Sequence, residues 1–485
     1  MSSKLTLQIC VARAQVIMAV SLRPFYIPAR YVSASMMRQL GRQTIPLVIS
    51  QIASFGIMTA DIIMMGQLSV FDLAAGSVAI RLYQPLYFFT LGLTAVVSPL
   101  ISQSIGAGDN DAARRTFRQG LVIALFLGVL FMPLVIFGAP LLEMLGQGAD
   151  VASHARDFLF WSGLSLPLFF LFMIFRFFVI GTQRTKAQLI VTIAGLIVNL
   201  VLNALFANGG FGIEARGLEG IAIATFISYF VMNLAFAAYV QFNPAFAKLH
   251  AFRRLWRIDI GLMRRIIRLG IPNAVIVLSE TSMFVIAGFM IGTFGTTALA
   301  SAGIANQIAA MAFMVPLGLS QATAAVVGRA AGENNPTNVG AAGWGAHIVG
   351  LIIAIPMTAL LLLFPEALTT IFIKPSDVNY VQTLPVVVAM LFYVGLFQVF
   401  DGMQIIASAK LRGINDTKIP AIMAVASYWG VGVGSVCLFA FVFDFGPASV
   451  WGGLGIGLAV ASVLTTYRWA RHLDAIARGR AILVG

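Results

Sequence analysis

The sequence predicts an all-α integral membrane protein with twelve transmembrane helices in two six-helix bundles, related by pseudo-two-fold symmetry. Three observations predict this fold: long apolar segments, a one-sided distribution of basic residues, and an internal repeat. The 485 residues are 59% hydrophobic and 10% charged, with a mean hydropathy of +0.93. This composition leaves little sequence for a large soluble domain.

Twelve apolar segments follow one another along the chain, each close to the roughly 20 residues that carry a helix across a hydrocarbon core about 30 Å thick. In order, they lie near residues 43–66, 78–104, 120–140, 157–180, 187–207, 217–241, 266–292, 301–328, 343–364, 380–408, 419–443 and 449–467. The connectors between them are short.

Basic residues fall almost entirely on one side of these crossings. Of the 31 Lys and Arg residues, 26 lie in or at the edge of the terminal segments and the even-numbered connectors, counting Arg268 at the edge of the seventh span, and 3 lie in the odd-numbered connectors. Only Arg81 and Arg176 are predicted further inside helices, and no Lys. Because basic flanks resist translocation, both termini are predicted to be cytoplasmic, in a multi-pass protein of the plasma (inner) membrane. The net charge of +13 therefore requires no nucleic-acid partner.

The chain repeats itself at a spacing of 226 residues. This shift matches Arg42 with Arg268, Pro46 with Pro272, and Gly106 with Gly332, each pair at the same place in the topology. A second match, 181–186 with 413–418, ends the fourth helix of each half. Two parallel repeats of six helices are predicted to face each other across a cleft.

These boundaries divide the chain into an N-lobe at 36–241, a cytoplasmic linker at 242–265 that is long enough for relative rocking, a C-lobe at 266–467, and a cytoplasmic tail at 468–485. Residues 1–35 form a basic extension without an acid, and its apolar runs are too short for a secretory signal. It is a cytoplasmic amphipathic extension, a transit-like leader, or the product of a start misplaced upstream of Met36. Cys10 and Cys437, the only cysteines, exclude a disulfide framework and a cysteine-based metal site.

Three acidic residues are predicted inside the membrane: Asp61, Glu280 and Asp401. Each costs on the order of 2.5 to 3.5 kcal/mol at mid-membrane, which argues that they are used. Each carboxylate could instead bond a neighbouring hydroxyl or a basic group. However, Arg81 and Arg176 lie near helix ends, where snorkelling accounts for them. The acids therefore suit a mobile cation, either Na⁺ through oxygen ligands or H⁺, which a carboxyl group away from water binds more readily.

Further polar residues in the first half fit a cation site around Asp61. Asn199 and Asn203 are four residues apart and share a helix face, and Thr225 lies in the next helix. Residues of this kind also serve as helix-to-helix hydrogen bonds, so the alternative of a structural role stays open.

Several segments resemble the MATE (multidrug and toxic compound extrusion) transporter family, in its NorM-type branch. They are Met58–Gly66 and Ser98–Asp109 in the first half and, in the second, Glu280, Ala300–Gln307, Pro316, Gly328, Gly332-Glu333, Gln398–Asp401 and Leu411–Gly413. The resemblance spans the chain from about residue 38.

The resemblance implies a cation-coupling role for Glu280 and Asp401, and an N-lobe cation site at Asp61, Asn199, Asn203 and Thr225. Substrate is expected to contact the three carboxylates. NorM-type members often carry Tyr four residues before the tenth-helix Asp, where this chain has Phe397.

The predicted function is therefore secondary active efflux of organic cations and other xenobiotics by antiport with Na⁺ or H⁺, in a monomer without a bound cofactor and with membrane lipid as its surroundings. A lipid-linked oligosaccharide flippase of the same superfamily is the main alternative, although its cleft would need several Arg or Lys. A membrane enzyme would need a catalytic constellation, and the four histidines are scattered. A receptor or scaffold would not need unpartnered carboxylates.

Overall fold

The computed structural model describes residues 28–210, 212–247, 249–255, 257–377 and 380–478. Among these residues, twelve helical segments are long and apolar enough to cross a membrane, which confirms the predicted number. Most of the predicted extension (1–27), Lys248 in the linker and the end of the tail (479–485) lie outside the described residues.

The first half contains η2 (Ala29–Tyr31), α2 (Ala34–Leu68), α3 (Val70–Thr94), α4 (Val97–Gly106), α5 (Asn110–Ile136), α6 (Gly138–Met144), α7 (Ala149–His154), α8 (Arg156–Gly181), α9 (Thr185–Asn208), α10 (Gly217–Phe242) and η3 (Pro244–Phe246). The second half contains α11 (Ile260–Gly292), α12 (Thr296–Gly332), α13 (Pro336–Leu363), α14 (Pro365–Thr369), α15 (Tyr380–Gly413), α16 (Lys418–Val425), η4 (Ala426–Val433), α17 (Gly434–Val436), η5 (Cys437–Val442) and α18 (Ser449–Ala477).

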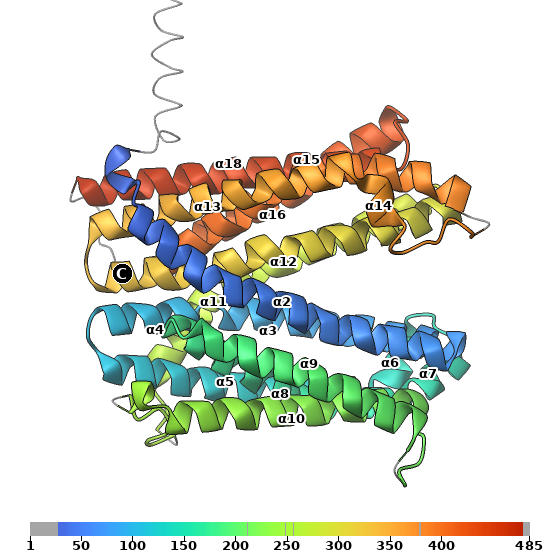
Figure 1. Ribbon diagram of the computed structural model, residues 1–485, viewed down its shortest axis with the longest axis horizontal. Helices are drawn as coiled ribbons and strands as arrows, with labels where there is room; N and C mark the ends of the chain where they lie inside the picture. The colour runs from blue at the N-terminus through green and yellow to red at the C-terminus, as the bar shows by residue number, and fades with distance from the viewer. Residues whose placement is uncertain (1–27, 211, 248, 256, 378–379, 479–485) are drawn as a thin grey trace, which may run out of the picture.

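The helices form two bundles, one from each half of the chain, and both described ends of the chain lie on the same side (Figure 1). Two long helices link the bundles. α2 packs on α13 of the second half near its start and on α9 of its own half further along, while α11 contacts both α5 and α16. α2 and α11 are the first helices of the two repeats. A two-fold relation between the halves requires that each of them packs on the third helix of the other half, as α2 does on α13 and α11 does on α5.

The pseudo-two-fold axis is visible in a reciprocal contact between α4 and α12. A Cβ atom at Gly106 would collide with the backbone carbonyl of Arg329, and one at Gly332 would collide with the carbonyl of Gln103. Gly106 corresponds to Gly332, and Gln103 to Arg329, under the 226-residue shift. The same pair of contacts is therefore made twice, once from each side, and glycine permits the close approach of the two backbones.

Several helices extend beyond the spans that hydropathy predicted, α15 and α18 among them. α15 continues to Gly413 instead of ending near 408, and α18 continues to Ala477 instead of ending near 467. Hydropathy stopped each span at the first basic residues. In the structure these are held within the bundle, since Lys410 is fully buried and Arg468 pairs with Asp416 at 2.6 Å.

The connection between the halves is fastened to the first half along most of its described length. Phe246, Leu249 and Ala251 are buried in the N-lobe core. From α5, Arg118 donates to the backbone carbonyls at 253 and 257, at 3.1 and 3.3 Å. The part of this segment that is free to bend therefore shortens to the few residues before α11.

Candidate functional site

The first-half acid lies in a closed network of hydrogen bonds between three helices. Asp61 on α2 accepts from Asn203 Nδ2 of α9 at 2.7 Å through Oδ1, and from Thr225 Oγ1 of α10 at 3.0 Å through Oδ2. Asn199 donates to Thr225 at 3.3 Å and accepts from Asn203 at 3.2 Å. The structure thus brings together all four residues that the sequence singled out here.

This network contains the ligand types that Na⁺ prefers. Asn199 and Asn203 are fully buried, and Asn203 Oδ1 has no hydrogen-bond partner among the described residues. With both Asp61 oxygens, Asn199 Oδ1 and Thr225 Oγ1, it makes a set of five oxygen atoms, the hard ligands that suit an alkali cation. Ion binding at this set stays a prediction, since the same bonds also hold α2, α9 and α10 together.

The second-half acids lie close together, and one of them has an oxygen atom without a hydrogen-bond partner. Glu280 on α11 and Asp401 on α15 are close enough for their charges to repel each other, and the Tyr428 hydroxyl on η4 lies near both. Asp401 is only 4% exposed, and its Oδ1 has no hydrogen-bond partner. None of the ion pairs between described residues involves Glu280, Asp401 or Asp61.

Other polar atoms around this acid pair also lack partners. In the described structure they are both amide atoms of Gln398, Gln404 Oε1, the Tyr428 hydroxyl and Trp451 Nε1, all of them buried. A buried polar group without a partner costs about 1 to 3 kcal/mol, and native proteins contain few of them. Together with Asp401 Oδ1, they give this part of the second half several polar atoms that water, an ion or a ligand can satisfy.

The departure at Phe397 has a structural counterpart. The Phe397 ring lies parallel to the Trp451 indole of α18, with 6.1 Å between centroids and 6° between planes. It is 3% exposed, one turn before Asp401. An aromatic ring without a hydroxyl group therefore occupies the position, one turn before Asp401, at which NorM-type members often carry Tyr.

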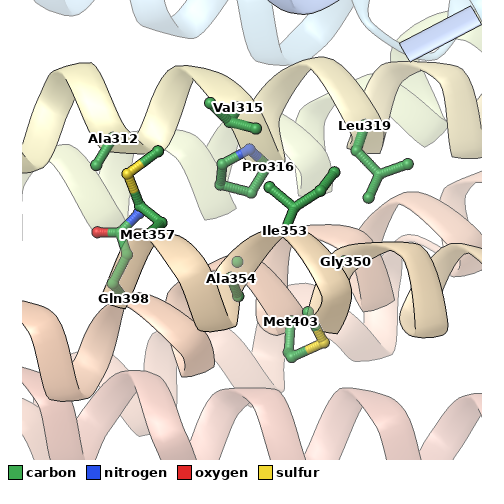
Figure 2. Close-up of a pocket in the computed structure, with 11 residues that line it drawn as sticks. Ala312, Val315, Pro316, Leu319, Gly350, Ile353, Ala354, Met357, Gln398 and Met403 are labelled. Carbon is green, nitrogen blue, oxygen red and sulfur yellow. The ribbon is translucent and has the colours of Figure 1, made fainter. Parts of the chain in front are cut away.

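A small, mostly apolar pocket of about 10 Å³ lies between α12, α13 and α15 (Figure 2). Pro316, Met357 and Met403 contribute to its wall, and Gln398 carries its amide group into it near Met357. Gln398 and Gly402, which line the pocket, lie within one helical turn of Asp401 along α15. Methionine side chains adapt their shape to different apolar groups.

Arg176 does not snorkel to the membrane surface, so that interpretation of the sequence was wrong. It is 3% exposed on α8 and donates from Nη2 to Gln321 Oε1 of α12 at 3.2 Å, across the two bundles. The large Phe-rich core around α8 covers it, and no hydropathy plot contains that information.

Lys410 is a second correction, because the sequence placed it in a connector. It is fully buried within α15, with its ammonium 4.9 Å from the Trp344 ring centroid, 5.1 Å from that of Trp469 and 3.3 Å from His347 Nε2. Nine residues separate it from Asp401, which at 100° per residue places the two on opposite faces of the helix, about 13 Å apart along the axis. Lys410 therefore leaves the acid pair without a counter-charge.

Sequence reasoning missed Tyr428 and Asn273. Tyr428 is one aromatic residue among many in an apolar span. Asn273 on α11 accepts from Arg412 at 2.8 Å and donates to the carbonyl of Gly92, in the other half, at 2.6 Å. A polar residue directly after Pro272 in an apolar helix was the available signal.

Comparison with known proteins places this arrangement among transporters. A family model named MatE matches residues 46–205 and 272–437. The chain is 34% identical over 429 residues to a probable multidrug resistance protein NorM of Mesorhizobium japonicum, covering 88% of this chain and 92% of that protein. It is also 34% identical over 423 residues to the protein of the same name from Pseudomonas putida, covering 87% and 91%.

Solved structures share the fold. The eukaryotic MATE transporter AtDTX14 superposes with a TM-score of 0.79 at 20% identity, over 90% of this chain and 98% of that one. A MOP superfamily transporter from Pyrococcus furiosus, described as having a binding pocket of reversed polarity, gives 0.83 at 22% identity, over 91% and 97%.

Proposed function

Because the chain belongs to the MatE family, we propose that it is a multi-pass plasma-membrane multidrug efflux transporter that exports organic cations by antiport, with Glu280 and Asp401 as the exchange site. The observation that carries the proposal is the pair of adjacent carboxylates without a basic partner in the described structure. Two like charges in a low-dielectric site favour binding of any cation that relieves their repulsion.

The exchange follows from competition for this pair. Na⁺ or H⁺ binds the carboxylates from outside and displaces an organic cation, and the empty pair then attracts the next organic cation from the cytoplasm. Phe397 and Trp451 supply aromatic surface near Asp401, which suits organic cations.

The first-half network plays a different part in this proposal. Asp61 already receives two hydrogen bonds, so its charge is stabilised without an ion. We assign it to a second cation site that acts on the packing of α2 against α9 and α10, while competition with substrate takes place in the second half.

The two buried basic residues described above do not favour the flippase alternative. Lys410 is enclosed by two Trp rings on the far face of α15, and Arg176 is bonded to Gln321. Both cations are already engaged within the protein, which does not favour a site for a pyrophosphate group at either of them.

The test is efflux of a fluorescent organic cation, ethidium, from proteoliposomes under an imposed Na⁺ or pH gradient. Wild type is compared with Glu280→Gln, Asp401→Asn and the control Glu366→Gln, an exposed acid of α14. We expect one gradient to drive efflux, both site variants to lose it by at least tenfold, and the control to retain it. Efflux that ignores both gradients and both substitutions would exclude the proposal.

A further inference from the structure

A second hollow, of about 510 Å³, opens at the predicted cytoplasmic end of the second half, between α11 and the loop that leads into α16. Its wall contains three basic residues, Arg265, Arg268 and Lys418, with Leu269 and Pro272 as the apolar part. It is far from the acid pair along the chain axis, since Arg268 precedes Glu280 by more than three turns of α11.

The charge of this hollow is positive and not neutralised by its one acid. Asp416 lines it but is paired with Arg468 of α18 at 2.6 Å. In the described part of the chain, neither Arg268 nor Lys418 takes part in an ion pair. The first turn of α16 adds to the field, because no side chain caps it and the N–H groups of Lys418 and Ile419 remain available to an anion.

An apolar surface continues from the hollow toward the middle of the membrane. Ile271 and Val275 on α11 and Ile422 on α16 are 45%, 38% and 57% exposed, and the two helices pack against each other. The site is thus basic at the membrane surface and apolar directly above it, which matches a charged headgroup with an acyl chain. A soluble phosphate compound would make no use of the apolar part.

The internal repeat shows which parts of the hollow are particular to the second half. Arg268 and Lys418 correspond to Arg42 and Lys186, so the first half carries the same two cations. Arg265, however, corresponds to Gln39, which donates to Gln183 at 3.4 Å and so bridges the equivalent opening. The first half is a natural control with similar surface charge and a bridged groove.

We propose that this hollow binds the phosphate headgroup of an anionic phospholipid of the cytoplasmic leaflet, with an acyl chain along α11 and α16. Basic pockets between membrane helices at this depth recognise anionic headgroups. The inference is independent of the coupling ion and of the exchange site.

Binding here would favour contact between the two halves. Asn415 lines the hollow and also forms a reciprocal amide pair with Gln103 of α4, with both distances 3.1 Å. A headgroup that holds the 414–418 loop in place therefore supports the contact that closes the predicted cytoplasmic side.

The experiment is native mass spectrometry and thermal unfolding of the full-length protein in detergent with added phosphatidylglycerol, phosphatidylcholine or inorganic phosphate. The variants are Arg268→Gln with Lys418→Gln and, as the matched control, Arg42→Gln with Lys186→Gln. Each pair removes two charges, and unfolding without lipid reports whether a variant is folded.

We expect wild type and the control pair to retain phosphatidylglycerol, and the Arg268/Lys418 pair to bind it roughly ten- to thirtyfold more weakly, from about 1 kcal/mol per basic residue. The proposal would be overturned if wild type bound phosphatidylcholine as tightly as phosphatidylglycerol. It would also be overturned if both double variants lost phosphatidylglycerol binding equally, or if the Arg268/Lys418 variant bound it as tightly as wild type. Stabilisation by inorganic phosphate that equals that by the lipid would overturn the lipid as the source of the anion.

Discussion

At the scale of single residues, burial separates the ionisable groups of this chain by function. Asp61 is bonded on both oxygens, Asp401 has an oxygen without a partner, and Lys410 is enclosed by aromatic rings. Of these three groups, only Asp401 has a carboxylate oxygen without a hydrogen-bond partner among the described residues, which suits exchange between a coupling ion and substrate. The difference lies in the neighbours of each group, since all three belong to apolar helices.

Lys410 offers a test of whether its charge or its stem stabilises the helix bundle. Two ring contacts offset only part of the cost of burying an ammonium, while its methylene chain fills space beside Gly343. We expect the unfolding temperature of Lys410→Met to be close to or above that of wild type. Lys410→Ala is expected to be less stable than wild type by about 2 to 3 kcal/mol, because it leaves a cavity. Thermal unfolding in detergent measures both, with exposed Lys186→Ala as the control. Equal destabilisation by Met and Ala would show that the charge matters more.

At the scale of elements, the eleventh span departs from a regular α-helix. α16 gives way to two π-helical stretches, η4 and η5, which widen the helix and turn the Tyr428 side chain toward Glu280 and Asp401. Such widened turns are rare overall, but those that occur often lie at functional sites. The exchange site therefore depends on backbone geometry in one helix and on acids from two others.

Tyr428→Phe tests that dependence. The buried hydroxyl lies close to Glu280 and Asp401 but makes no well-formed hydrogen bond, so its removal costs little stability, and we expect an unfolding temperature close to that of wild type. Efflux of ethidium is expected to fall by about tenfold, because the group that approaches the carboxylates when a cation binds is lost. Tyr393→Phe, on α15, is the control. A variant with full efflux would remove Tyr428 from the site.

The sequence was sufficient for the elements and for the polar residues, but not for their partners. Hydropathy and charge asymmetry depend on each residue's own chemistry, so they predicted twelve spans and the three acids. Packing between helices that are far apart in the chain determines three other features: the π-helical register of the eleventh span, the burial of Lys410 between two Trp rings, and the hydrogen bond from Arg176 to Gln321. Local sequence patterns do not predict such packing.

At the scale of the whole molecule, the two halves meet through repeated contacts from the middle of the helices to the predicted cytoplasmic end. Gly92 lies against Ala274 of α11, and the equivalent pair under the 226-residue shift, Gly318 and Val48, is equally close. The amide pair of Gln103 and Asn415 closes the same end. Opening to the cytoplasm must therefore separate surfaces with no room for larger side chains.

Gly332→Leu tests this closure. A side chain here would collide with the backbone at Gln103 and hold α4 and α12 apart, so the predicted cytoplasmic side could not close and efflux should fall at least tenfold. Gly303→Leu in the same helix is the control, because nothing lies within 4 Å of its Cβ position. Distances between spin labels on the two halves would report the separation. Normal efflux and an unchanged distance in Gly332→Leu would contradict the proposed closure.

The pair of acids also predicts how transport responds to voltage. If two monovalent cations enter for each monovalent substrate that leaves, one net charge crosses, worth about 2.3 kcal/mol per 100 mV or roughly a fiftyfold gradient. We expect a valinomycin-imposed potential to accelerate wild-type efflux. In any residual exchange by Asp401→Asn, one acid remains and the effect of potential should disappear. Voltage-independent efflux by wild type would show one-for-one exchange.

The anchoring of the interlobe segment to α5 determines where the molecule can articulate. With Phe246 and Leu249 embedded in the first half and Arg118 holding two carbonyls, the joint between the halves is only a few residues long and sits directly at the foot of α11. Rotation of one half relative to the other therefore takes place at the start of α11. Because α11 also carries Glu280, this rotation moves the carboxylate directly.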